Sequence, residues 1–269
     1  MLTAKDIMVK DVIKVAKGTR LSYAIKLMRK HKISRLVVVD DSDKVLGVIT
    51  ETTIMDRLGA QRTGNLNPSR LTVVSVMSDK LVTAPPSLSV FDVAKIMIEK
   101  NISGVPIVVN NTLVGLITKI ELLKLVANSD NNEKASEFLD STYKVIPPDV
   151  RIIHARQVML EGKMDALIIG KNNEPLGIIT DRIIANALAQ LRSDESWKHF
   201  DEVLSRVLVE DIMITPQPIK STTTVSKAAR SLLEERVKAL AVVDDTNKII
   251  GSISRTSIIK GIAEGKITV

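Results

Sequence analysis

The sequence contains no cysteine among its 269 residues. Disulfide frameworks, thiolate metal sites, iron–sulfur clusters and cysteine nucleophiles are therefore excluded. No apolar run approaches the roughly 18 to 20 residues that a helix needs to cross a bilayer, and charge appears as early as Lys5 and Asp6. These absences predict a cytoplasmic protein that has no membrane anchor and no membrane partner.

Aromatic residues are also scarce, at 2% of the chain, so the core must be built from aliphatic side chains and methionine. Proteins that bind single-stranded nucleic acid by stacking bases on aromatic faces are thereby disfavoured. The remaining composition, 45% hydrophobic and 26% charged, is that of an ordinary folded protein. The length suffices for one large or two small cores.

The net charge of +7 is unevenly placed. Residues 1–135 carry 20 Lys and Arg against 13 Asp and Glu, whereas residues 136–269 carry 18 against 18. An excess of positive charge in one half fits an anionic ligand or partner for that half, and it fits an ordinary solvated surface as well. Both interpretations stay open at this point.

Self-similarity is the strongest signal in the chain. A short apolar segment that begins with glycine and ends in a hydroxyl occurs four times, at spacings of 68, 62 and 74 residues. We call its first residue the anchor glycine. The four copies are Gly47-Val48-Ile49-Thr50, Gly115-Leu116-Ile117-Thr118, Gly177-Ile178-Ile179-Thr180 and Gly251-Ser252-Ile253-Ser254.

The same elements surround each copy. Upstream lies an amphipathic helix with apolar positions about 3.6 residues apart, as in Leu21, Ala24, Ile25 and Met28, then an apolar strand such as 36–39 and a polar turn. A second helix follows the anchor. The unit is β-α-β-β-α, and its strands are apolar on both faces, so they need cover from helices and from another unit.

Four such units predict an α/β (α+β) protein made of repeats at 1–63, 71–127, 137–192 and 204–269. One unit alone would have too small a core to fold stably. The polar segment 128–133 separates the second unit from the third, so we expect repeats 1 and 2 to pair, and repeats 3 and 4.

This pattern resembles the CBS (cystathionine beta-synthase) domain family. The residues that carry the resemblance are Asp6-Ile7-Met8 and Asp211-Ile212-Met213, the stretches 81–86 and 103–109, and the four anchors. The resemblance implies that two repeats form a Bateman module and that two modules form a flat disc. Such a disc is built either within one chain, as a monomer, or between two chains of a homodimer.

The resemblance also implies a regulatory ligand, held in clefts between paired repeats: an adenosine compound such as AMP, ADP, ATP or S-adenosylmethionine. In the family a hydroxyl three residues after the anchor glycine contacts the phosphate or ribose, and an Asp six residues after it binds the ribose hydroxyls. Here the latter position holds Thr53, Glu121, Ile183 and Ser257. Only Glu121 keeps a carboxylate, so the third repeat is the weakest candidate for ligand binding.

The first module offers the better phosphate site. Arg35 is similar to the arginine with which the gamma subunit of AMP-activated kinase holds a nucleotide phosphate. In the corresponding place repeat 4 has Lys238, whereas repeat 3 has Asp165, whose charge would repel a phosphate. The geometry of family pairs brings the start of one repeat to the anchor of the other. The candidate cleft therefore combines Arg35, Thr50, Thr52, Thr53 and Thr83.

Further candidates lie in the other clefts. The second cleft of the first module would combine Thr118 and Glu121 with the backbone of Val105 and Pro106 and with Lys14; in the second module the candidates are Lys238, Ser254 and Ser257. Each has a simpler explanation. A Thr or Ser before a helix is often an N-cap, and an exposed Arg or Glu is often a solvated or ion-paired charge.

An enzyme is not predicted. His31, His154 and His199 are isolated, and no phosphate-binding loop, nucleophile elbow or zinc motif is present. The acidic stretch 40–43 has a counterpart at 244–247, so a polar β-turn explains both better than a metal site. We therefore expect no catalytic residue, no metal and no required cofactor.

The sequence thus favours a stand-alone sensor that binds an adenosine nucleotide and signals to an unknown regulated protein. Two alternatives remain. Arg57, Arg62 and Arg70 motivate a nucleic-acid-binding protein, although no nucleic-acid-binding motif accompanies them. Since three repeats lack the ribose carboxylate, a scaffold with empty clefts is the second alternative.

Overall fold

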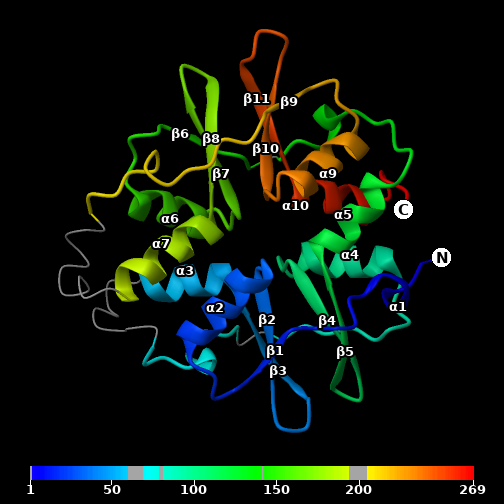
Figure 1. The fold of residues 1–269 in the computed structure, drawn as a ribbon. Coiled ribbons are helices and arrows are strands. Elements are labelled where there is room, and N and C mark those ends of the chain that lie inside the picture. The colour runs from blue at the N-terminus through cyan, green and yellow to red at the C-terminus, as the bar shows by residue number, and fades with distance from the viewer. Residues whose placement is uncertain (1, 60–68, 79–80, 141, 194–204) are drawn as a thin grey trace.

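A computed structural model describes residues 2–59, 69–78, 81–140, 142–193 and 205–269. Arg62 and His199, which the sequence singled out, lie outside these residues. The structure has four copies of a small sheet flanked by helices (Figure 1), which confirms the predicted fold class and its four repeats.

The first half of the chain forms repeats 1 and 2. Repeat 1 begins with a short helix, α1 (Ala4–Ile7). It continues with β1 (Lys14–Ala16), α2 (Leu21–His31), β2 (Arg35–Val39), β3 (Val45–Thr50) and α3 (Glu51–Gly59). Repeat 2 consists of the 3-10 turn η2 (Val73–Ser75), α4 (Val90–Glu99), β4 (Gly104–Val109), β5 (Thr112–Thr118) and α5 (Lys119–Ala127).

The second half repeats this order. Repeat 3 consists of η3 (Ala135–Phe138), β6 (Val145–Ile146), α6 (Ile152–Glu161), β7 (Ala166–Lys171), β8 (Glu174–Thr180) and α7 (Asp181–Ser193). Repeat 4 consists of β9 (Ile219–Lys220), α9 (Val225–Glu234), β10 (Ala239–Val243), β11 (Ile249–Ser254) and α10 (Arg255–Ala263). In repeats 1, 3 and 4 the first strand runs parallel to the second, and the second runs antiparallel to the third.

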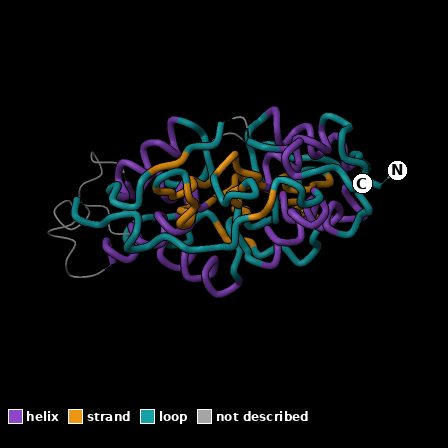
Figure 2. The backbone as a smooth tube through the Cα atoms, turned by 90° about the horizontal axis from the view of Figure 1, so that it is seen from above, coloured by secondary structure: helices purple, strands orange, loops and turns teal. Residues whose placement is uncertain are grey.

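Burial follows the sequence pattern. The four apolar positions of α2 named above are all buried, and every residue of β2 is buried on both faces of its sheet. Helices cover these strands on both sides, as Figure 2 shows from above. The repeats therefore share cores instead of each having its own.

The anchor glycines make room for the start of the partner repeat. A Cβ atom at Gly177 would lie 2.5 Å from the backbone carbonyl oxygen of Ile214 in repeat 4. At the other three anchors the obstacle is an apolar side chain of the partner repeat: Met77 at Gly47, Met8 at Gly115 and Leu139 at Gly251. Glycine thus stands at these positions because two repeats approach each other closely there.

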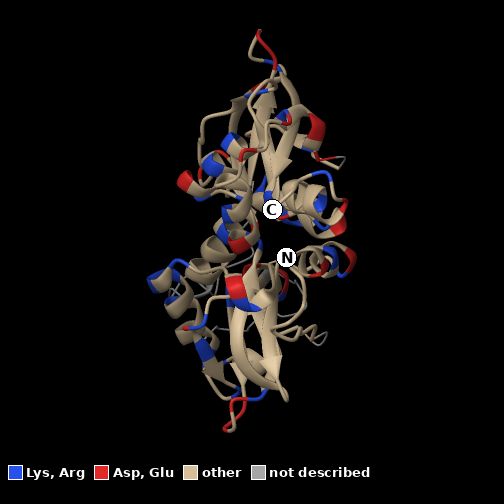
Figure 3. Ribbon diagram, turned by 90° about the vertical axis from the view of Figure 1, so that its right-hand side faces the viewer, with Lys and Arg blue, Asp and Glu red and all other residues tan. Residues whose placement is uncertain are grey.

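Pairing joins repeats 1 and 2 into a first module and repeats 3 and 4 into a second. Short β-bridges connect the members of each pair, such as Val9 with Leu116 and Ile178 with Ile214. The two modules form the lower and upper halves of a flattened disc (Figures 1 and 3), and the N- and C-termini lie near each other where they meet.

Helices hold the two modules together. Helix α3 of repeat 1 packs on α7 of repeat 3, and α4 and α5 of repeat 2 pack on α10 and α9 of repeat 4. Consequently one hydrophobic cluster is built mainly from repeats 1 and 3, and the other mainly from repeats 2 and 4. A single chain therefore completes the disc.

We expect Gly177→Ala to lower the free energy of unfolding by about 1 to 3 kcal/mol, because the methyl group meets a backbone carbonyl that no rotamer change can move. Urea denaturation measures this. Gly18→Ala is the control, since nothing lies within 4 Å of a Cβ there. Equal stability of both variants would contradict the role given to the anchor.

Candidate functional site

A cavity of about 260 Å³ opens at the predicted cleft of the first module. Its wall in repeat 1 includes Arg35, Thr50, Thr52 and Thr53, so the structure brings four of the five predicted residues together. Thr83 does not line the cavity, although its neighbour Val82 does. The other walls come from repeats 2 and 3 and include Asn101, Ser103, Gly104, Lys119, Met159, Leu160, Lys163, Met164 and Asp165.

Arg35 begins β2 and is 8% exposed. One terminal nitrogen, Nη2, donates to Ser103 Oγ at 2.7 Å, and a side chain at Gly104 would collide with the guanidinium. Among the described residues Arg35 Nε has no hydrogen-bond partner. Burial lowers the pKa of Arg35, while Asp165 and Glu51 oppose that shift. Residues of repeat 2 therefore enclose the Arg35 guanidinium, and its Nε–H has no hydrogen-bond acceptor among the described residues.

The threonines at the start of α3 cap the helix. The backbone N–H of Thr53 donates to Thr50 Oγ1 at 3.1 Å, and the N–H of Thr50 donates to Thr53 Oγ1 at 3.0 Å. Ser254 and Ser257 make the same reciprocal bonds. The N-cap explanation thus holds for these residues. Thr50 and Thr53 border the cavity in addition, whereas Ser257 lines none of the cavities described here.

The residues predicted for the second cleft of the first module make structural contacts. Glu121 accepts from the N–H and hydroxyl of Thr118 at 2.9 and 2.6 Å, which makes it a capping residue of α5. Lys14 pairs with Asp43 at 2.7 Å. Val105 is fully buried in β4, and the carbonyl of Pro106 accepts from the N–H of Ala84. Ligand binding by this set stays a prediction.

A smaller cavity of about 80 Å³ lies in the cleft of the second module. Lys238 and Ser254, both predicted, line it, together with Asp140. Asp140 accepts hydrogen bonds from Ser252 Oγ at 3.0 Å and Ser254 Oγ at 2.8 Å. Burial raises the pKa of Asp140. This carboxylate was not among the predicted residues, because no motif marks its position near the start of repeat 3.

Charged side chains from all four repeats meet at the centre of the disc. The residue after each anchor's terminal hydroxyl is charged, acidic in repeats 1 and 3 (Glu51, Asp181) and basic in repeats 2 and 4 (Lys119, Arg255). An alignment of the four repeats at the residue after the anchor hydroxyl would have revealed these alternating charges. We call this group the central charge cluster, and it also contains Arg35, Asp165, Arg182 and Lys238.

Lys238 holds the acidic pair of the cluster. Its ammonium contacts Asp181 Oδ1 and lies 3.3 Å from Glu51 Oε2. Arg182 Nε donates to Glu51 Oε1, and the hydroxyl of Thr52 donates to Asp181 Oδ2 at 2.6 Å. Burial raises the pKa of Glu51, and Lys238 opposes it. Repeat 4 thereby neutralises acids of repeats 1 and 3.

Asp165 was expected to repel a phosphate at its own repeat. It lines the cleft of its own module, and it also faces the cleft of the first module, where Lys119 Nζ lies 3.5 Å from its carboxylate. Burial alone would raise the pKa of Asp165, but Lys119, Lys238 and Arg35 together lower it. Asp165 therefore remains a carboxylate that partly neutralises the phosphate site predicted at Arg35.

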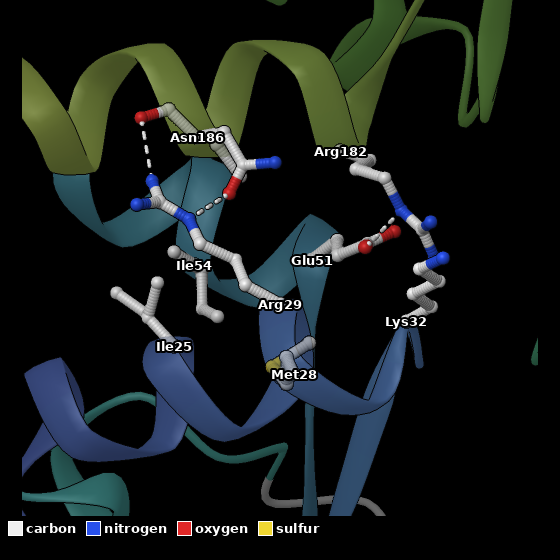
Figure 4. Close-up of a pocket in the computed structure, with 9 residues that line it drawn as sticks. Ile25, Met28, Arg29, Lys32, Glu51, Ile54, Arg182 and Asn186 are labelled. Carbon is white, nitrogen blue, oxygen red and sulfur yellow. Dashed lines mark hydrogen bonds and ion pairs between the residues drawn. The ribbon is translucent and has the colours of Figure 1, made fainter.

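A third hollow of about 190 Å³ lies between α2, α3 and α7 (Figure 4). Arg29 Nε donates to Asn186 Oδ1 at 2.9 Å, which ties the two modules together, and Lys32 points toward Arg182. No cluster of three His, Cys, Asp or Glu suited to a metal is found in the part of the chain that the structure describes. Within the same residues no helix is long and apolar enough to span a membrane.

Four paired repeats of the same strand and helix order, with clefts between them, define a tandem-repeat α/β protein. The CBS domain model matches residues 4–60, 73–128, 135–190 and 209–264. The chain belongs to the CBS domain family.

Relatives extend this likeness to the whole chain. The uncharacterized protein MJ1225 of Methanocaldococcus jannaschii is 26% identical over 93% of this chain and 95% of its own. Its crystal structure, described as that of a proposed archaeal homologue of g-AMPK, superposes with a TM-score of 0.84 at 24% identity over 96% of this chain and 99% of its own. An uncharacterized conserved protein from Pyrococcus horikoshii shares the fold, with a TM-score of 0.66 at 15% identity. The match covers 97% of this chain and 100% of that protein's chain.

Some solved relatives are described with bound ligands or ions. The CBS domain pair of protein MJ0100, in complex with 5'-methylthioadenosine and S-adenosyl-L-methionine, is 30% identical, covers 46% of this chain and 95% of its own, and has a TM-score of 0.42.

We expect Lys238→Met to lower the free energy of unfolding at neutral pH by about 3 to 5 kcal/mol, because it leaves the buried Asp181 without its cation and Glu51 with Arg182 alone. Since burial raises the pKa of Glu51, the part of the penalty that Glu51 causes is absent while Glu51 is protonated and grows as the pH rises through that pKa. The deficit relative to wild type should therefore shrink toward pH 4.

Denaturant unfolding between pH 4 and 8 measures this deficit. Lys248→Met is the matched control, because its ion pair with Glu174 is exposed on both sides and contributes under about 1 kcal/mol. A pH-independent deficit in Lys238→Met would show that lost packing, and not the buried charges, causes the destabilisation.

Proposed function

We propose that this protein is a regulatory sensor that binds an adenosine nucleotide in the cleft of the first module. The observation that carries the proposal is the composition of the 260 Å³ cavity, which places a row of hydroxyls beside a group of cations. Pockets for drug-sized ligands have volumes of about 300 to 1,000 Å³, so this cavity suits a ligand at the small end, such as AMP.

The phosphate would bind at the cationic end of the cavity. Arg35, Lys119 and Lys163 supply the positive charge there. The start of α3 lies beside them, where Thr50, already the helix cap, lines the cavity. Charged donors next to a helix start are a favourable environment for an anion.

The nucleoside would occupy the rest of the cavity. Val48, Val82, Ile102, Met159 and Leu160 supply apolar surface for a base. The ribose hydroxyls have polar partners in Ser78, Asn101 and Ser103, which also line the cavity. Because Thr53 replaces the family's ribose aspartate, ribose binding here depends on hydroxyl and amide groups instead of a carboxylate.

A ligand at this place would change how the modules pack. The cavity has walls from both modules, since Met159 to Asp165 belong to repeat 3 and the other residues to repeats 1 and 2. A ligand that contacts both modules favours the packing in which those contacts are best, to the extent of its differential affinity. We propose that a regulated protein binds the surface so altered; the likeness to MJ1225, itself proposed as a homologue of g-AMPK, supports this role.

Isothermal titration with AMP, ADP, ATP and S-adenosylmethionine tests the proposal. Saturable binding of one compound is expected, and Arg35→Met should weaken it about 10- to 100-fold, because a hydrogen bond to a charged group contributes about 1.5 to 3 kcal/mol. Methionine fills much of the socket without the charge. Arg151→Met, at an exposed arginine before α6, is the control and should leave binding unchanged.

Other outcomes would favour the alternatives. Equal affinity of wild type and Arg35→Met for the nucleotide would contradict the proposed phosphate site. No binding of any adenosine compound, together with oligonucleotide binding that weakens steeply with salt, would favour a nucleic-acid-binding protein. Binding of neither class would favour a scaffold.

A further inference from the structure

One carboxylate is shared by three cavities. Asp165 lines the first module's cleft, the second module's cleft and a small space of about 20 Å³ at the centre of the disc. No other described residue lines all three. It follows the turn between α6 and β7, where Lys163 adopts a left-handed backbone conformation with φ of 50°. Its side chain is 34% exposed, so it faces the cavities and has room to turn.

The surroundings of Asp165 are almost entirely cationic. Lys119 lies 3.5 Å away, Arg35 and Lys163 line the first cleft with it, and Lys238 lines the second. Arg35 and Lys119 are the same groups that the proposed function assigns to the phosphate. The carboxylate thus occupies the place where opposite charge is most favourable in the absence of a ligand.

We propose that Asp165 is an internal substitute for the ligand's phosphate, which an anionic ligand must displace from Lys119, beside Arg35, before it binds. The inference rests on the proposed function and deepens it, since it names the residue that sets affinity and selectivity for charge. The displaced carboxylate turns toward the second cleft, where Lys238 and Lys163 are its cationic partners and Asp140 is the one other acidic side chain among the lining residues. Asp165 acts at the candidate phosphate site through its charge alone, and no covalent bond is formed or broken.

Displacement affects ligands according to their charge. A phosphate close to Asp165 is repelled by it and must compete with it for the same donors, whereas the uncharged nucleoside adenosine requires no such exchange. Removing the charge of Asp165 should therefore improve AMP binding and leave adenosine binding nearly unchanged. A purely structural role of Asp165 would alter both ligands alike.

Titration of AMP and adenosine into wild type, Asp165→Asn and Asp165→Ser tests this. Asparagine is nearly isosteric; serine is a second neutral variant in case asparagine perturbs the fold, which thermal unfolding checks. Glu174→Gln is the control with the same change in net charge, because Glu174 lies in an exposed ion pair of the same repeat. We expect AMP to bind about 10-fold more tightly to both Asp165 variants, adenosine to change less than about 2-fold, and Glu174→Gln to change neither.

The same titrations distinguish a failure of the role proposed for Asp165 from a failure of the proposed function. If AMP binds wild type but the ratio of AMP to adenosine affinity is unchanged in folded Asp165 variants, the role of Asp165 is wrong and the proposed function stands. A ratio that falls would also overturn it, because Asp165 would then assist the phosphate. If neither compound binds wild type or any variant, the proposed function fails, and this inference with it.

Discussion

The disc depends on buried charges that no single repeat can neutralise. Glu51 and Asp181 come from repeats 1 and 3, and the cation that contacts both, Lys238, comes from repeat 4. An ionised carboxylate in a protein interior is costly unless a partner and hydrogen bonds accompany it. The partners exist only when both modules are in place, so the central charge cluster links the folding of each module to the assembly of the disc.

The candidate site inherits its properties from this arrangement. Arg35 can stay charged in a buried socket because carboxylates of the other module lie near it, and Gly104 leaves it room. The cavity beside it is closed on one side by repeat 3, so a ligand there contacts both modules. The cluster that stabilises the disc is therefore also the one that a ligand's phosphate would disturb.

The sequence predicts those features of the molecule that depend on local residue patterns. Helix faces, strands and the convergence of Arg35 with Thr50, Thr52 and Thr53 follow from periodicity and from the family resemblance. It could not place Asp165, because the contact of that residue with the first cleft depends on how two modules pack. It also could not decide whether Glu121 binds a ligand or caps a helix, because the hydrogen bonds from Thr118 to Glu121 are visible only in the structure.

The unlike charges of the two modules have a consequence for how the chain can associate. Were a first module to pair with its own duplicate in the same manner, Arg35 would stand where Asp165 now stands, and two guanidinium groups would face each other beside two Lys119 ammonium groups. A pair of second modules would instead lack Arg35 and Lys119 opposite its Asp165. The charges at these central positions therefore favour the pairing of two unlike modules within one chain over the pairing of two like modules.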